Sequence, residues 1–173
     1  NALCIGNSLT DHAPSQSIGY YGDGWPMAAS CLETGWVYEL QGIFKEKIPS
    51  AVVGKIGGTT ISAFERNPQN YVTDSDFDAI MGDYVGADLD LIIYKAGENV
   101  YSSMATAYKA GLKRFVNYLK RKYTSAQIFS AQPFYASGVA AQVAYEVAAE
   151  ENVDYIADPT STNYRQRLGM YTF

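Results

Sequence analysis

The stretch LDLIIY, residues 89–94, is the clearest strand in the chain, and the fold class depends on it. It is short and apolar, as expected for a strand in the middle of a sheet. Gly97, Glu98 and Asn99 follow it, so a polar turn comes directly after its carboxyl end. Ligands of open α/β sheets bind at the carboxyl ends of the strands, and this turn is therefore a candidate site.

Further strands and helices alternate on both sides of this stretch. The other predicted strands are the short apolar segments 2–5, Ala51-Val52-Val53 within 50–56, 127–131 and 153–157. Amphipathic spacing predicts helices over 32–47, 103–123 and 139–151, and helix is also compatible with 76–84. Thr59 or Thr60 is expected to cap a short helix that runs to Phe64. This order predicts a five-stranded, mainly parallel sheet with helices on both faces.

Length and composition favour one globular domain over residues 1–173. Hydrophobic residues make up 47% of the chain and charged residues 18%, which excludes a disordered chain. The net charge of −5, with no basic run, argues against nucleic acid as a partner. No apolar stretch approaches the length of about 18 residues that a membrane span needs. The chain begins inside a strand, without Met or a signal peptide, which suggests a mature or trimmed form.

The cysteine and histidine content argues against a metal site. The chain has two cysteines, Cys4 and Cys31, and one histidine, His12, without ligand spacing. We therefore expect no metal and no cofactor. Cys4 lies in an apolar run and is most simply a buried small hydrophobic residue, although pairing with Cys31 stays open.

Three polar turns follow predicted strands, and the expected topology brings them to one edge of the sheet. They are Gly6-Asn7-Ser8, Gly57-Gly58-Thr59 and Gly97-Glu98-Asn99. Acyl transfer needs a nucleophile and hydrogen-bond donors that face a developing oxyanion. Ser8 could supply the nucleophile, and the donors could be its own N–H, the N–H of Gly58 and the side-chain amide of Asn99. Taken singly, Ser8 and Asn99 are more simply interpreted as helix caps, and the two glycines as a tight turn.

In this order, the three turns resemble the sequence blocks of the SGNH hydrolases, also called GDSL-like esterases and lipases. Residues 6–10 (GNSLT) look like the first block, 56–60 (IGGTT) like the second and 97–100 (GENV) like the third. The resemblance covers nearly the whole chain. It implies a flavodoxin-like three-layer α/β/α sandwich, with Ser8 as nucleophile and Ser8, Gly58 and Asn99 as the oxyanion hole.

The chain departs from this family pattern in three places. Asn7 and Val100 each stand where the family usually has Asp. The family's last block, Asp-x-x-His, provides the general base, yet no histidine follows His12. Leu168 and Gly169 are consecutive in this sequence. We expect that the Asp-x-x-His block belongs between them and is missing here. Two alternatives are a non-catalytic descendant that keeps the pocket, and another base such as His12, which we interpret as a pocket-wall residue.

The expected substrate is a decorated carbohydrate or another small ester. The loop over 11–30 is rich in aromatic residues, including Trp25, and aromatic rings beside a shallow polar site suit a sugar. We expect Asn7, Gly57, Glu98, His12 and Trp25 to contact substrate. Glu65 and Arg66 are ascribed either to substrate contact or, by default, to a surface ion pair.

The sequence therefore predicts a serine ester hydrolase that removes acyl groups, acetyl in the first place, from a glycan or small-molecule ester. The alternative is an inactive domain of the same fold that binds carbohydrate. A flavodoxin-like nucleotide-binding domain is a third reading, but no turn has the G-x-G-x-x-G pattern. The sequence leaves the oligomeric state open, and a secreted or periplasmic location is favoured.

Overall fold

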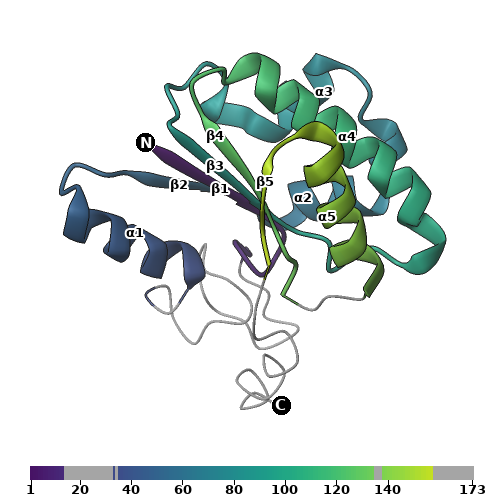
Figure 1. The fold of residues 1–173 in the computed structure, drawn as a ribbon, viewed down its shortest axis with the longest axis horizontal. Coiled ribbons are helices and arrows are strands. Elements are labelled where there is room, and N and C mark those ends of the chain that lie inside the picture. Colours follow the sequence, from purple (N-terminus) through teal and green to yellow (C-terminus); the bar gives the residue numbers. More distant parts are fainter. Residues whose placement is uncertain (14–32, 34, 135–137, 158–173) are drawn as a thin grey trace, which may run out of the picture.

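The fold is built on five parallel strands in the order β2-β1-β3-β4-β5 (Figure 1). The computed structural model describes residues 1–13, 33, 35–134 and 138–157. The strands are β1 (Ala2–Gly6), β2 (Val53–Ile56), β3 (Leu91–Lys95), β4 (Gln127–Ala131) and β5 (Asp154–Ile156). This is the flavodoxin-like strand order, so the predicted parallel sheet is confirmed.

Helices cover both faces of the sheet and complete a three-layer α/β/α sandwich. The helices are α1 (Trp36–Lys47), α2 (Gly58–Arg66), α3 (Asp74–Met81), α4 (Ala105–Lys122) and α5 (Gly138–Glu151). Short 3-10 turns lie at η3 (Pro68–Asn70), η4 (Gly82–Tyr84) and η5 (Ser102–Met104). Figure 1 shows α1 on one side of the sheet and the other four helices on the opposite side. The predicted α/β/α architecture is therefore confirmed.

The alternation of side chains along the strands divides the core between these two faces. On β1, Leu3 and Ile5 point into the large cluster under α2, α3, α4 and α5, whereas Cys4 points to the smaller cluster under α1. On β3, Ile92 and Tyr94 join the large cluster and Ile93 joins the small one. Because successive strand residues point to opposite faces, every central strand is buried on both sides.

Two local predictions are wrong at the second strand and helix. Strand β2 begins only at Val53, and Val52 is exposed, because the parallel register pairs Val53 with Ala2 at the start of β1. Helix α2 begins at Gly58 with Gly57 as its N-cap, so neither Thr59 nor Thr60 caps it. The helix thus starts directly at the end of the sheet.

Cys4 is a free thiol buried in the sheet, as expected of a small hydrophobic residue. Its burial raises the pKa of the thiol to about 12, so it stays protonated and unreactive at neutral pH. None of the described helices is both long and apolar enough to cross a bilayer.

Candidate active site

Ser8 lies in a tight turn at the carboxyl end of β1, and Asn7 holds that turn. The Asn7 carbonyl accepts hydrogen bonds from the backbone N–H groups of Thr10 (2.8 Å) and Asp11 (3.1 Å). Its side-chain Oδ1 accepts a third from Leu9 N–H at 3.0 Å, a local arrangement for which Asn is well suited. Ser8 is half-buried, and its hydroxyl has no hydrogen-bond partner within the part of the chain that the structure describes. It therefore caps no helix there.

The second turn, at Gly57 and Gly58, packs directly against the first. A Cβ on Gly57 would lie only 2.5 Å from Asp11 Cβ and 2.9 Å from Asp11 N, so only glycine fits. Gly58 has a φ of 64°, in the left-handed region that favours glycine. As N-cap, Gly57 offers no side chain to the N–H groups of the first turn of α2. Such groups carry the positive end of the helix dipole and favour an anion.

A buried carboxylate, Glu65 on α2, joins the first and third turns. The Glu65 side chain is 0% exposed. Its Oε1 accepts hydrogen bonds from Asn7 Nδ2 (2.9 Å) and from the backbone N–H of Gly97, and its Oε2 accepts one from Asn99 Nδ2. The expectation of a surface ion pair at Glu65 is therefore wrong, because the residue lies under the site.

The third turn is fixed by α2 on one side and by the loop after β4 on the other. Asn99 Nδ2 also donates to Ser62 Oγ at 3.4 Å, and Arg66 Nη2 donates to Asn99 Oδ1 at 3.3 Å. Ser62, Glu65 and Arg66 lie at i, i+3 and i+4, which places them on one face of the helix. The Asn99 amide group is thus held by three side chains of α2.

Glu98, in the third turn, is hydrogen-bonded both to the first turn and to the loop after β4. Its Oε2 accepts a hydrogen bond from Asn7 Nδ2 at 2.5 Å, and its Oε1 accepts one from Phe134 N–H at 2.6 Å. The Asn7 amide therefore bridges the carboxyl groups of Glu65 and Glu98. Since Asn7 is only 1% exposed, it serves as a bridge behind the surface.

Burial and charge repulsion raise the pKa of Glu65 to about 7. Loss of hydration is the main cause, and the nearby Glu98 adds to it, whereas hydrogen bonds from Asn99, Asn7 and Gly97 act in the opposite direction. The hydroxyls of Tyr94 and Tyr108 lie 2.9 Å apart in the adjoining core. Burial raises their pKa values well above that of free tyrosine, so both are neutral at neutral pH.

Aromatic and charged side chains border the three turns. Trp36 Nε1 donates to Thr10 Oγ1 at 3.2 Å, and the Trp36 ring meets the Phe134 ring edge-on, with centroids 6.3 Å apart. Lys95 Nζ lies 3.9 Å from the centroid of Phe134. Both rings are half-buried. The sequence offered no sign of this pair, because Trp36 lies in the predicted helix over 32–47 and Phe134 is far from it in the chain.

Of the remaining predicted site residues, His12 lies just after the first turn, and the others lie outside the described residues. His12 is half-buried, and its Nδ1 pairs with the carbonyl of Ala13, its neighbour in the chain. Asp11 forms an ion pair with Lys55 at 3.0 Å. Trp25, the rest of the aromatic loop over 14–32, Cys31 and the segment around Leu168–Gly169 lie outside the described residues.

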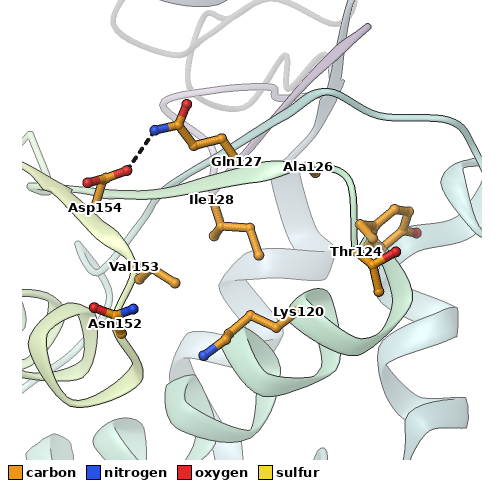
Figure 2. A pocket seen from close by; sticks show the side chains of 9 residues that line it. Lys120, Thr124, Ala126, Gln127, Ile128, Asn152, Val153 and Asp154 are labelled. Atoms are coloured by element: carbon orange, nitrogen blue, oxygen red, sulfur yellow. Dashed lines mark hydrogen bonds between the residues drawn. The ribbon is translucent and has the colours of Figure 1, made fainter.

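A cavity of about 460 Å³ lies at the opposite edge of the sheet, by the amino ends of β4 and β5. Figure 2 shows Gln127 and Asp154 facing each other there, joined by a hydrogen bond of 2.8 Å. Lys120, across the cavity, donates to the carbonyl of Glu151. Within the described ranges, no group of three or more His, Cys, Asp or Glu residues could hold a metal ion at either edge.

Comparison with known proteins bears on the fold alone. No protein-family model matches the chain, and no curated protein is significantly similar to it. One solved crystal structure matches with a TM-score of 0.57, over 95% of this chain and 83% of that chain, at 12% sequence identity. At that identity, the likeness supports the α/β/α architecture.

Proposed function

We propose that the protein is a serine ester hydrolase that removes acyl groups, acetyl in the first place, from a carbohydrate or another small ester. The observation that carries the proposal is the meeting of three turns at one sheet edge. Glu65 hydrogen-bonds to Asn7, Gly97 and Asn99, and Gly57 packs on the turn that holds Ser8. Sites of open α/β sheets occur at this edge.

In the proposed reaction, Ser8 Oγ attacks the ester carbonyl carbon and forms a tetrahedral intermediate. The backbone N–H groups of Ser8 and Gly58 and the side-chain amide of Asn99 stabilise its oxyanion. One Asn99 Nδ2 proton is used by Glu65, and the other makes only a 3.4 Å contact with Ser62 Oγ. We assign this second proton to the oxyanion. Collapse of the intermediate releases the alcohol, and water then hydrolyses the acyl-serine.

The proton of Ser8 needs an acceptor, since a serine hydroxyl is a weak nucleophile without a base. His12 is the single histidine of the sequence, and its Nδ1 is paired with Ala13 O. We propose that the base comes from an Asp-x-x-His segment, which the family resemblance places between Leu168 and Gly169.

The pair Trp36 and Phe134 supports a carbohydrate as the alcohol part of the substrate. Half-buried rings beside a polar site offer a flat apolar surface together with hydrogen-bonding neighbours, which suits the faces of a sugar. The hydrogen bond from Trp36 to Thr10 ties this pair to the turn that carries Ser8.

The direct test is the Ser8→Ala variant of the full-length protein, assayed with 4-nitrophenyl acetate. Loss of the nucleophile lowers kcat by at least about 10,000-fold. Ser75→Ala, at an exposed position of α3, is the matched control and keeps the wild-type rate. Unchanged turnover in Ser8→Ala, with an intact circular dichroism spectrum, contradicts the assignment.

A second candidate function is carbohydrate binding without catalysis. It is favoured by the Ser8 hydroxyl, which has no hydrogen-bonded base among the described residues, and by the inward direction of the Asn99 amide. This alternative predicts glycan binding that Trp36→Ala weakens, with no acyl turnover by the full-length protein. Calorimetric titration with acetylated oligosaccharides, alongside the esterase assay, separates the two functions.

A further inference from the structure

Glu65 receives hydrogen bonds from two loops that are far apart in the sequence. Asn7 belongs to the turn after β1, whereas Gly97 and Asn99 belong to the turn after β3. Glu65 itself lies on α2, the helix that begins at Gly58. One carboxylate therefore joins α2, which begins at Gly58, to the two turns that carry Ser8 and Asn99.

All three partners of Glu65 are donors, so the position is matched to a carboxylate. An ionised carboxylate only accepts hydrogen bonds and has about four lone-pair positions for them. A glutamine here would turn its own NH₂ group toward donors, and an alanine would leave Asn7, Gly97 and Asn99 without their buried acceptor. Neither replacement preserves the three contacts.

The charged and titratable groups around Glu65 come from four segments: β3, the turn after it, α4 and α2 itself. Glu98, in the turn after β3, disfavours its ionisation, and the neutral hydroxyls of Tyr94 on β3 and Tyr108 on α4 lie in the core beside it. Arg66, on α2 itself, contacts Asn99. The turn after β1 contributes the uncharged amide of Asn7.

We propose that Glu65 is the positioning residue of the candidate active site: its carboxylate sets the turn of Asn7 and Ser8, and the side chain of Asn99, in place against α2. The effect on catalysis rests on the proposed function, whereas the effect on the two turns does not. Glu65 Oε2 is the charged acceptor among the three α2 side chains that hold Asn99, and a misplacement of about 1 Å in such a donor costs about 100-fold in rate.

Protonation of Glu65 weakens this arrangement, because the added proton faces only donors among its three partners. The pKa of about 7 places that change near neutral pH. The ordered site therefore belongs to the pH range above 7. Below it, one of the three contacts is weakened, whereas the carbonyl oxygen of the protonated group still accepts hydrogen bonds.

The experiment compares the full-length wild type with Glu65→Gln and with Glu46→Gln, an exposed control on α1. The backbone amide signal of Gly97 is followed by NMR from about pH 5 to about pH 9. We expect this signal to titrate in the wild type and in Glu46→Gln with a midpoint at about 7, and to be flat in Glu65→Gln. The amide signals of Ser8 and Asn99 shift in Glu65→Gln.

Kinetics with 4-nitrophenyl acetate form the second arm. We expect Glu65→Gln to lower kcat about 100-fold with KM within about 2-fold of wild type; an inflection of the rate near neutral pH that remains in this variant belongs to the proposed histidine base. A purely structural role would lower the amount of folded protein and leave the kcat of the folded variant unchanged.

Each outcome decides the proposal. A Gly97 amide that does not respond to pH in the wild type overturns it without any variant, even where Glu65→Gln does not fold. A Glu65→Gln variant with wild-type kcat and pH profile also overturns it. Absence of turnover in the wild type contradicts the proposed function instead, and the Gly97 titration then decides the role of Glu65.

Discussion

The two edges of the sheet differ in what their polar groups do. At the amino edge, a cavity of about 460 Å³ is open, yet Gln127 and Asp154 bond to each other. At the carboxyl edge, Asn7 bonds to Glu65 and to Glu98, which lie 58 and 91 positions away in the chain. Buried polar groups that join distant segments at a sheet edge are therefore a better indicator of the candidate site than the volume of a cavity.

The comparison of the two edges predicts that the free energy of unfolding depends on pH through Glu65, at the carboxyl edge of the sheet. Glu65 has a pKa of about 7 in the folded protein and 4.5 as its ordinary value. The folded state therefore binds the proton of the Glu65 carboxyl group more tightly than the unfolded state does. As a result, the free energy of unfolding falls as pH rises from 4.5 to about 7 and then stays level. The expected fall is about 3 kcal/mol.

Urea unfolding at a series of pH values measures this fall. The difference between wild type and Glu65→Gln isolates Glu65, because the carboxylates of Glu146 and Glu150, which pair with Lys109 and Lys113, are present in both proteins. If the free energies of unfolding of the two proteins differ by the same amount at pH 4.5 and at a pH of about 7, Glu65 has no proton-linked role.

A smaller effect is expected where the two turns touch. Gly57→Ala places a methyl group 2.5 Å from Asp11 Cβ, and we expect it to lower the free energy of unfolding by about 1–3 kcal/mol. The matched control is Gly42→Ala on α1, where nothing lies within 4 Å of the added carbon. This control is expected to gain about 0.5–1 kcal/mol, since alanine favours helix. Equal effects at both positions would show that the two turns are not in close contact.

The smallest effect is expected at the amino edge. Gln127→Ala removes an exposed hydrogen bond to Asp154, and we expect the free energy of unfolding to change by no more than about 0.5 kcal/mol, with esterase activity intact. Thermal unfolding measures the change in stability, and the 4-nitrophenyl acetate assay measures the esterase activity. Loss of activity in this variant would transfer the functional site to the cavity shown in Figure 2.

The sequence predicted the fold well wherever local pattern decides structure. Strand β4 has the predicted bounds, and the apolar face predicted for 103–123 is buried in α4. Local pattern failed at Val52, which has the apolar character of a strand but lies before the register begins. The start of α2 was missed for a related reason, because Gly57 caps the helix through its place at the sheet edge, without a side chain.

For the candidate site, the sequence predicted the three turns but not what joins them. Glu65 has the charge of a surface residue, and only its contacts with Asn7, Gly97 and Asn99 explain its burial. One signal was present: Glu65 lies four residues after Ile61 and one after Phe64, on the buried side of α2. The pairing of Trp36 with Phe134 had no such signal, since it brings the start of α1 against the loop after β4.

The most direct test of the central claim is covalent labelling of the full-length protein with a fluorophosphonate, followed by peptide mass spectrometry. A serine activated for acyl transfer attacks the phosphorus and keeps the phosphonyl group. We predict one adduct, on Ser8, that is absent from Ser8→Ala. An unlabelled protein, or an adduct confined to other serines, would contradict the assignment of this sheet edge as the active site of an ester hydrolase.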